Sequence, residues 1–315
     1  MKNTTIAAAI SFVATTGLLA CDGESEDPIE DAGEDEGTAP RDNRVELPPV
    51  DDQHHTFVGQ EVVIEPGEDK MYCFHMVAEE DLALTDIEML QGEYGHHSII
   101  VASTDPQPAG TIEDCSDDEA TSKFTAFLVP VAGAPEGAAY WVEKGTPIVL
   151  QSHYVNASDE ALLVRDAVHT RRVPIDDVTL WMAPFTTSAF DFEIPGDGSL
   201  VETSFDCVID RDLDLLSVGG HMHELGSSFE FAIGPSEDEL QRIYQVDTWV
   251  PEFRDVPPVE LYASQPLQLA AGTVMRTTCR WENRTGEAAY FPQEMCTGFG
   301  VLAGTKELYD CRTGF

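Results

Sequence analysis

The chain has 315 residues, of which 42% are hydrophobic and 9% aromatic. That is enough apolar material for a sizeable core and about two domains. Its 58 acidic residues against 17 Lys and Arg give a formal net charge of −41. Nucleic acids and anionic membrane surfaces are bound through lysine and arginine, so this balance argues against both partners. An acidic surface also serves solubility, and therefore identifies no partner by itself.

Residues 1–20 have the features of an export signal. Lys2 supplies a positive charge, and the apolar stretch that follows is too short for a membrane span. The stretch ends in Leu-Leu-Ala-Cys, which resembles a bacterial lipobox whose cysteine, here Cys21, is lipidated and begins the mature chain. We therefore expect an exported lipoprotein, held to the bacterial cell envelope by this lipid alone and facing the periplasm or the cell surface. An ordinary signal peptide with a chance cysteine is the alternative.

Residues 21–55 are predicted to form a disordered, acidic tether. Nine acids and no base lie between Asp22 and Glu36. The segment therefore repels itself, and it buries too little apolar surface to offset its ordering entropy. His54 and His55 close the segment. A metal-ligand role for them is the weaker interpretation, because histidine pairs in polar segments are usually just solvated.

From residue 56 onward the chain is predicted to be all-β. Short runs of β-type residues alternate with Gly, Pro and Asp, and the main stretch that is ambiguous between helix and strand is 236–245. Many short strands favour antiparallel sandwiches or barrels. We expect two β-sandwich domains, residues 56–172 and 173–315. The clearest runs are 62–64, 98–101, 148–153, 178–182, 228–233 and 274–280.

Six cysteines remain once Cys21 is set aside. An even number in an exported chain favours three disulfides over reactive thiols, and the absence of a CxxC motif weakens a thiol-redox or zinc-ribbon interpretation. Six cysteines allow fifteen pairings, among which spacing alone does not choose. They are Cys73, Cys115, Cys207, Cys279, Cys296 and Cys311.

Histidines carry the candidate chemistry. His221 and His223 form an HxH pair, and residues i and i+2 of a strand point to the same face, which places two imidazoles side by side as a metal seat. The following residues do not complete the zinc-protease motif HExxH, because Ser227 replaces the second histidine. Beyond residue 55 the histidines are His75, His96, His97, His153, His169, His221 and His223.

His96 and His97 form a different arrangement. Adjacent side chains of a regular strand point to opposite faces, so both can reach one metal ion only at a bulge or at a strand start. Gly92 and Gly95 make such an irregularity plausible. His153 lies at the end of the apolar run 148–153. A hydrogen-bonded core or surface imidazole is the common fate of each histidine alone, and only their combination favours metal binding.

Four motifs in chain order carry a resemblance to a known family. They are His96-His97, Leu-Gln-Ser-His-Tyr at 150–154, His-Met-His-Glu-Leu-Gly at 221–226 and Glu-Met-Cys at 294–296. Together they resemble the copper type II, ascorbate-dependent monooxygenases, the family of peptidylglycine α-hydroxylating and dopamine β-monooxygenases. The resemblance runs from about residue 72 to residue 311. Ala-Val-His-Thr at 167–170 is similar to the family's interdomain segment.

The resemblance implies two consecutive antiparallel jelly-roll sandwiches of eight or nine strands, each with one copper ion. The first copper would be bound by His96, His97 and His153, and the second by His221, His223 and Met295. The ligand chemistry agrees, since three neutral imidazoles suit both oxidation states of copper and a thioether beside two imidazoles favours Cu(I).

The resemblance also implies a pairing of the cysteines and two supporting residues. The disulfides would be Cys73–Cys115, Cys207–Cys311 and Cys279–Cys296, the last of which anchors the backbone beside Met295. Gln151 and Tyr154 are the candidate supporting groups of the three-histidine site. Ordinary strand packing is the alternative role for both.

The activity implied is hydroxylation of a substrate C–H bond with O2 and an external reductant, ascorbate or another. The copper held by His221, His223 and Met295 would bind O2, and the three-histidine copper would deliver the second electron. Peptide-hydroxylating members have an arginine at the position of Gly219, and an asparagine and a tyrosine where this chain has Thr297 and Phe299. Carboxylate-terminated glycyl peptides are therefore not expected as substrates, and the small molecule or peptide that is hydroxylated stays open.

Two other functions remain in view. One is a copper-binding lipoprotein on the same fold that stores, senses or delivers copper without hydroxylating anything. The other is an adhesion or ligand-binding β-module whose histidines are accidental. Copper stoichiometry separates the latter from the other two, and oxygen uptake coupled to a reductant separates the remaining pair.

Overall fold

The structure is a computed structural model that describes residues 39–115 and 123–313. Residues 39–315 form one compact unit, while 1–38, which carry the predicted signal, Cys21 and the most acidic part of the tether, lie outside the described residues. The described chain is all-β, as predicted, with no α-helix and two short 3-10 helices, η1 (Ile175–Asp177) and η2 (Pro251–Arg254). None of its helices is long and apolar enough to cross a membrane.

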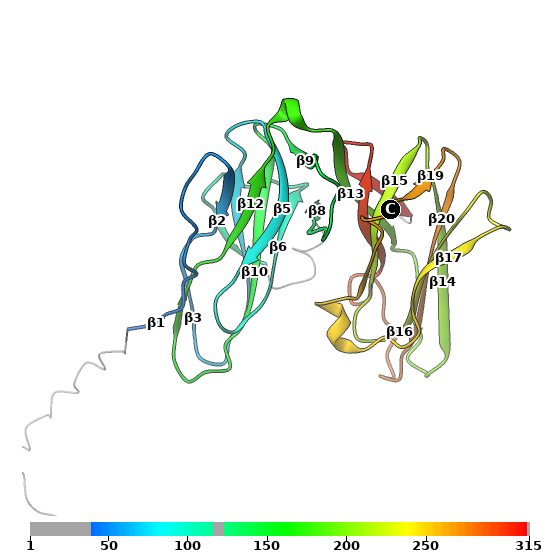
Figure 1. Cartoon of the computed structure of the whole chain (residues 1–315). Helices are drawn as coiled ribbons and strands as arrows, with labels where there is room; N and C mark the ends of the chain where they lie inside the picture. Colours follow the sequence, from blue (N-terminus) through cyan, green and yellow to red (C-terminus); the bar gives the residue numbers. More distant parts are fainter. Residues whose placement is uncertain (1–38, 116–122, 314–315) are drawn as a thin grey trace, which may run out of the picture. The chain divides into compact units, whose positions relative to one another are not determined.

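Two layers of strands build the first half of the fold, coloured blue to green in Figure 1. Its strands are β1 (Arg41–Asp42), β2 (His54–Val58), β3 (Val62–Ile64), β4 (Asp69–Val77), β5 (Leu82–Leu90), β6 (Gly95–Ser103), β7 (Ile112–Asp114), β8 (Phe124–Leu128), β9 (Ala138–Val142), β10 (Pro147–Val155), β11 (Leu162–Val164) and β12 (Ala167–Arg172). A five-stranded sheet, β7-β4-β10-β6-β8, faces β9-β5-β12-β2. Phe74 and Ile100 of the one layer pack with Leu84 and Val168 of the other.

The second half repeats this plan. Its strands are β13 (Leu180–Ala189), β14 (Leu200–Val208), β15 (Leu213–His221), β16 (Gly226–Gly234), β17 (Gln241–Val246), β18 (Val259–Leu261), β19 (Leu267–Leu269), β20 (Val274–Glu282), β21 (Cys296–Ala303) and β22 (Tyr309–Thr313). A four-stranded sheet, β14-β20-β16-β17, faces β18-β15-β21-β13. Phe231 and Trp281 of the one layer pack with Phe185 and Leu215 of the other.

The two halves share one sheet, which the sequence did not predict. Strands β9 and β13 pair in parallel, and so join the two facing layers into a ten-stranded sheet, β18-β15-β21-β13-β9-β5-β12-β2 with β19 and β22 at its side. The apolar core of the first half continues onto Leu216 and Val301 of the second. Pairs β1–β11 and β13–β22 are also parallel, so the sheets are mixed rather than purely antiparallel. The predicted boundary after residue 172 falls between β12 and β13, and a jelly-roll connectivity in each half stays a prediction.

The predicted strand runs lie within strands of the structure, with one shift. The run 178–182 begins two residues before β13, which starts at Leu180. The ambiguous stretch 236–245 is a turn followed by β17 rather than a helix. It pairs with β16, where Phe231 lies opposite Tyr244, so neighbouring β-strand partners decide a segment whose own pattern does not.

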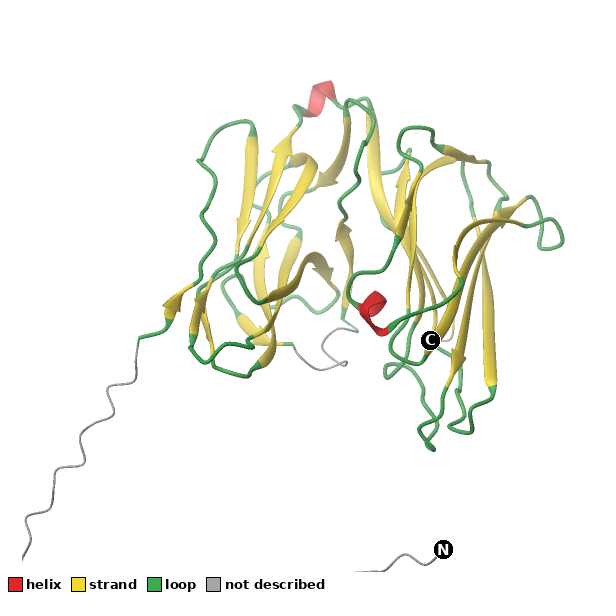
Figure 2. Ribbon diagram, turned by 60° about the horizontal axis from the view of Figure 1, so that its bottom comes forward, coloured by secondary structure: helices red, strands yellow, loops and turns green. Residues whose placement is uncertain are grey.

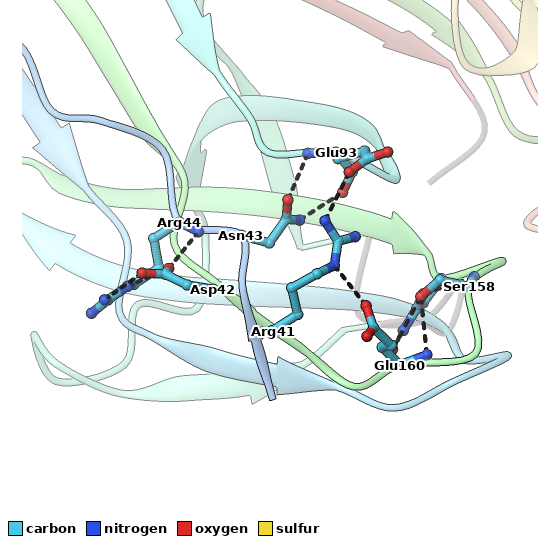
Figure 3. Close-up of polar contacts among 8 residues, drawn as sticks. Arg41, Asp42, Asn43, Arg44, Glu93, Ser158 and Glu160 are labelled. Atoms are coloured by element: carbon cyan, nitrogen blue, oxygen red, sulfur yellow. Dashed lines mark hydrogen bonds and ion pairs between the residues drawn. The ribbon is translucent and has the colours of Figure 1, made fainter. Parts of the chain in front are cut away.

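The predicted tether is too long at its C-terminal end, because residues 39–55 are hydrogen-bonded to the first half. Arg41 forms ion pairs with Glu93 and Glu160 at 3.0 and 3.1 Å, and the amide of Asn43 donates to the Glu93 carbonyl at 2.7 Å (Figure 3). Strand β1 also pairs with β11. The basic residues of this stretch, which the more acidic part before it lacks, give it partners on an acidic domain.

All three disulfides implied by the family resemblance are present. They join Cys73 to Cys115, Cys207 to Cys311 and Cys279 to Cys296. The first links β4 to the residue that follows β7. The second links β14 to β22, near the end of the described chain. The third links β20 to the start of β21, next to Met295.

Candidate metal sites

The rings of His96, His97 and His153 lie together, with centroids 5.0 to 5.6 Å apart. His96 and His97 are at the start of β6, and His97 is the register partner of His153 on β10. The register then shifts, since Tyr154 lies opposite Gly95, which leaves His96 as an extra residue in its strand. This irregularity at a strand start is the condition under which adjacent histidines can share one metal ion.

Hydrogen bonding orients the ring of His153. Its Nε2 lies 2.6 Å from Oδ1 of Asp69, so Nε2 donates its hydrogen and Nδ1 holds the lone pair. Nδ1 of His153 and Nδ1 of His97 are both buried without a hydrogen-bond partner. A carboxylate on the second ring nitrogen is the usual support of a metal-bound histidine. A metal ion would satisfy both buried nitrogens, so the donors fit a metal site.

A fourth donor, Asp255, comes from the second half of the chain. It follows η2, and its Oδ2 lies 2.9 Å from Nε2 of His96 while its Oδ1 lies 3.8 Å from Nδ1 of His97. One ligand atom from each of His96, His97, His153 and Asp255 lies within 4.8 Å of all the others. Sequence reasoning missed Asp255, because it is 159 residues from His96 and no local pattern marks it.

Burial keeps the imidazole of His97 neutral. Burial lowers the pKa of His97 to about 4, and the charge of His153 adds to this effect while that of Asp255 opposes it. Burial would raise the pKa of the Asp255 carboxyl, but the hydrogen bond with His96 and the charges of His96 and His97 hold it below its usual value. A neutral His97 imidazole beside an ionised Asp255 carboxylate has the protonation states that metal binding requires.

A partly buried polar network lies behind the three histidines. Nε2 of Gln91 lies 3.0 and 3.2 Å from the carbonyl oxygens of His97 and His153, and 3.0 Å from Oδ2 of Asp166. The Tyr154 hydroxyl donates to Asp166. Burial raises the pKa of the Asp166 carboxyl, although its hydrogen bonds with Tyr154 and Gln91 oppose this. Gln91 thus ties β6 to β10 directly at the two histidines.

Gly92 and Gly95 allow the turn before His96 to close, as the sequence suggested. A Cβ atom on Gly92 would lie 2.3 Å from the carbonyl oxygen of Asn43, and one on Gly95 would lie 2.1 Å from Cγ of Gln91. No side chain fits at these distances. The N-terminal segment that contains Asn43 therefore packs against the turn that carries His96.

The two supporting residues expected from the resemblance have different places. Tyr154 belongs to the buried network through Asp166. Gln151 is buried, and its Nε2 lies 3.8 Å from both sulfur atoms of the Cys73–Cys115 disulfide. Gln151 therefore packs on the disulfide, while Gln91, which the sequence did not single out, contacts the backbone of the histidines.

His221 and His223 form the second group, with ring centroids 5.2 Å apart. The expectation that both lie on one strand is corrected, because β15 ends at His221 and His223 lies in the following turn. The carboxylate of Glu294 causes this break: it accepts the backbone N–H groups of His223 at 3.0 Å and Leu225 at 2.6 Å. Nδ1 of His223 lies 3.0 Å from the Gln293 carbonyl, so it donates there and the lone pair is on Nε2.

Met295 is half-buried and lies in the segment that holds this turn. Glu294 precedes it, is 1% exposed, and also accepts the Trp281 indole N–H at 3.1 Å. Two residues after Met295, Thr297 is the register partner of His221. Since Cys296 is bonded to Cys279, the backbone on both sides of Met295 is fixed close to the histidine pair.

Gly219 lies under an aromatic ring. Gly219 and Phe299 are register partners on β15 and β21, and a Cβ atom on Gly219 would lie 2.7 Å from Cζ of the Phe299 ring. The aromatic ring occupies the space into which a longer side chain would extend. Gly219 and Phe299 therefore form one packed pair.

One segment of the second half lies against both groups of histidines. Asp255 contacts His96, and the backbone of the preceding Arg254 forms a hydrogen bond with His221. Burial lowers the pKa of His221 to about 3, the charges of His223 and Arg254 lower it further, and a hydrogen bond to the Arg254 backbone opposes them. Figure 2 shows η2, the short helix that ends at Arg254, on the side of the second half that faces the first.

The other histidines have structural partners. The buried His75 forms a hydrogen bond with Glu113, its Nε2 lying 3.1 Å from the carboxylate. His54 stacks on His169 with a centroid distance of 4.8 Å, and its Nδ1 lies 2.9 Å from Asp51. His55 packs edge-on against Phe57. His54 and His55 thus have contacts within the first half.

No protein-family model matches the sequence, and no curated protein matches it. Among solved structures, the STIV MCP is 6% identical over 80% of this chain and 96% of its own, with a TM-score of 0.30. The stem and receptor binding domain of the spike protein P1 from bacteriophage PM2 is 8% identical over 82% and 98%, with a TM-score of 0.18. The infectious bursal disease virus VP2 subviral particle is 9% identical over 85% and 74%, with a TM-score of 0.20. Scores this low support no conclusion about function.

Proposed function

We propose that this protein is a copper-dependent monooxygenase that hydroxylates a C–H bond of a small molecule or peptide. One oxygen atom of O2 enters the C–H bond, and the other is reduced to water with two electrons from ascorbate or another reductant. The observation that carries the proposal is the presence of two separate groups of imidazoles. One of them, His96, His97 and His153, has two buried ring nitrogens without a hydrogen-bond partner.

Neighbouring residues hold the donors of the first group in place. Asp69 keeps a proton on Nε2 of His153 and so directs the Nδ1 lone pair away from itself. Gln91 fixes the backbone carbonyls of His97 and His153. When bound, copper would supply the one-electron chemistry and the O2 binding that amino-acid side chains lack.

The residues of the second group are held by Glu294 and by the Cys279–Cys296 disulfide. The Gln293 carbonyl orients the ring of His223 through Nδ1, and Glu294 holds the turn around it. A thioether from Met295 would make this site softer than the first, which favours reduced copper and hence reaction with O2. Copper held by His96, His97 and His153 would supply the second electron.

We propose that the substrate is not bound through a carboxylate group at this site. Phe299 covers Gly219, so no basic side chain extends from that position.

The three disulfides support an oxidising compartment. Export and lipid anchoring through Cys21 belong to the same proposal.

Two reciprocal variants of the mature chain test the function. Met295→Ala should abolish reductant-dependent O2 uptake while keeping about one copper ion at the three histidines. His153→Ala should keep the copper of the second site and lose turnover because the second electron is missing. Copper content, X-ray absorption for one sulfur scatterer, and O2 electrode measurements give the readouts.

The outcomes separate the candidate functions. If both variants consume O2 and reductant as fast as the parent, the proposed sites are not catalytic. If the parent binds about two copper ions but shows no O2 uptake with any reductant tried, the non-catalytic copper-binding lipoprotein is the better description. A parent that binds no copper favours the ligand-binding β-module.

A further inference from the structure

The carboxylate of Asp255 comes from the second half of the chain and lies against the three histidines of the first half. Its two oxygen atoms face two different imidazoles, Nε2 of His96 at 2.9 Å and Nδ1 of His97 at 3.8 Å. The Asp255 side chain is 23% exposed, so it is largely withdrawn from water. Surface carboxylates usually point into solvent, and this one is directed at nitrogen donors.

A simple hydrogen bond between His96 and Asp255 accounts for only part of this geometry. It explains the contact with His96, but it leaves Nδ1 of His97 and Nδ1 of His153 buried and without hydrogen-bond partners. Buried polar atoms of this kind are uncommon unless something completes them. One ligand atom from each of these four residues lies within 4.8 Å of all the others. A cation bound there through the two Nδ1 atoms and the carboxylate would satisfy all three.

We propose that Asp255 is the fourth ligand of a divalent metal ion at His96, His97 and His153, so that the metal ties the second half of the chain to the first. The inference rests on the proposed function in so far as it uses the same three histidines. It adds a ligand from the other half of the chain and a preference between oxidation states. A carboxylate is a hard donor, which suits Cu(II) and Zn2+ and contributes little to Cu(I).

A consequence follows for the two groups of histidines. The backbone of Arg254 forms a hydrogen bond with His221, and Asp255 is the next residue. A metal that binds Asp255 therefore fixes the segment that lies against both groups. Reduction to Cu(I) weakens this tie, since the carboxylate then has less to gain from the metal. The link between the halves is thus tighter in the oxidised than in the reduced protein.

The test compares Asp255→Asn with Glu252→Gln in the full mature chain. Both changes remove one negative charge from the same segment, but Glu252 is exposed and is not among the four donors. Asparagine keeps an oxygen acceptor for His96, so the fold is retained. Each is made in a His221→Ala background, which weakens the second group so that the titration reports the first. Cu2+ is titrated aerobically and Cu+ anaerobically.

Asp255→Asn should weaken Cu2+ binding about 10- to 100-fold, and change Cu+ binding less than about threefold. That selective loss raises the reduction potential of the site by about 59 to 118 mV. Cu2+ should also slow amide hydrogen exchange in residues 251–256 of the parent and not in Asp255→Asn. Glu252→Gln should match the parent in each measurement.

Two results would overturn the inference, and they are distinguishable from each other. Equal Cu2+ affinity and an unchanged Cu2+ EPR spectrum in Asp255→Asn remove Asp255 from the ligand set but leave the three-histidine copper site and the proposed function intact. If the parent binds neither Cu2+ nor Cu+ at the three histidines, the proposed function fails together with the inference.

Discussion

At the residue scale, the packing of β15 against β21 depends on close contacts between single residues. Gly219 lies under the Phe299 ring, where a Cβ atom would be 2.7 Å from Cζ. The nearest protein atom is thus part of a rigid aromatic side chain and not of the backbone. The ring can move only if its own packing changes, so the pair acts as a unit.

We predict that Gly219→Ala lowers the free energy of unfolding by about 1–3 kcal/mol, the usual cost of adding a methyl group to a packed site. In a Phe299→Ala background the same change should cost less than about 0.5 kcal/mol, because the ring is gone. Urea unfolding of the four proteins gives the coupling energy. Additive effects would show that ring and glycine are independent.

A second prediction at this scale concerns protons. In the metal-free protein the pKa of His97 is about 4 and that of His221 about 3, both mainly through burial, against 6.5 for an ordinary histidine. Below pH 6.5 the unfolded chain therefore binds more protons than the folded one, and stability falls as the pH falls. Between pH 7 and 5 the loss should be on the order of 2 kcal/mol per histidine.

Urea titrations in a chelator at several pH values measure this slope. His97→Gln and His221→Gln should each flatten it, because each removes one of the two groups that gain a proton on unfolding. A slope unchanged in both variants would assign the acid sensitivity to carboxyl groups instead.

At the element scale, each group of histidines depends on one polar side chain that joins two segments, the half-buried Gln91 or the buried Glu294. Gln91 does this for β6 and β10, and Glu294 does it for β21 and the turn after β15. Burial raises the pKa of the Glu294 carboxyl, while hydrogen bonds from Leu225, His223 and Trp281 oppose the rise. Both carboxylate oxygens of Glu294 accept hydrogen bonds, so replacing either oxygen with a donor group leaves an N–H group without its acceptor.

Glu294→Gln should therefore destabilise the protein by about 2–4 kcal/mol, since a side-chain NH2 group would face backbone N–H donors. It should also weaken copper binding at His221 and His223 while the three-histidine site keeps its copper. Glu287→Gln, at an exposed position on the same stretch of chain, is the control. Equal stability of the two variants would contradict the role assigned to Glu294.

At the scale of the whole molecule, the N-terminal segment and the shared sheet support the sites from outside. Residues 39–50 pair with β11 through β1, form ion pairs through Arg41, and pack Asn43 on Gly92 beside the turn that leads to His96. The ten-stranded sheet continues through β9 and β13, so the halves are joined by backbone hydrogen bonds as well as by apolar packing.

Removal of residues 1–50 should consequently lower the melting temperature and weaken copper binding at the three histidines. Removal of residues 1–38 should change neither, because residues 39–315 form a compact unit of their own. Scanning calorimetry and copper titration of both shortened chains check this. If both behave like the mature chain, residues 39–50 do not support the site.

The all-β class and most strand positions followed from short-range patterns. Runs such as 62–64 and 228–233 have the period of a strand, and their Gly, Pro and Asp neighbours mark the turns. The disulfide pairing needed the family resemblance, because six cysteines alone allow fifteen pairings. The length of the tether was misjudged because the acidity of residues 22–36 was extended to a stretch that contains Arg41 and Arg44.

The candidate site divides in the same way. His96 with His97 and His221 with His223 were visible in the sequence, because histidines at such short spacing are unusual. His153 was found by its place at the end of an apolar run. Asp255, Gln91 and Asp166 were not, since single polar residues are common and their partners lie far along the chain: Asp255 is 159 residues from His96, and Asp166 is 75 residues from Gln91. Local spacing determines which imidazoles can act together. Only the tertiary structure decides which carboxylates and amides surround them, because those contacts arise when distant strands and turns pack.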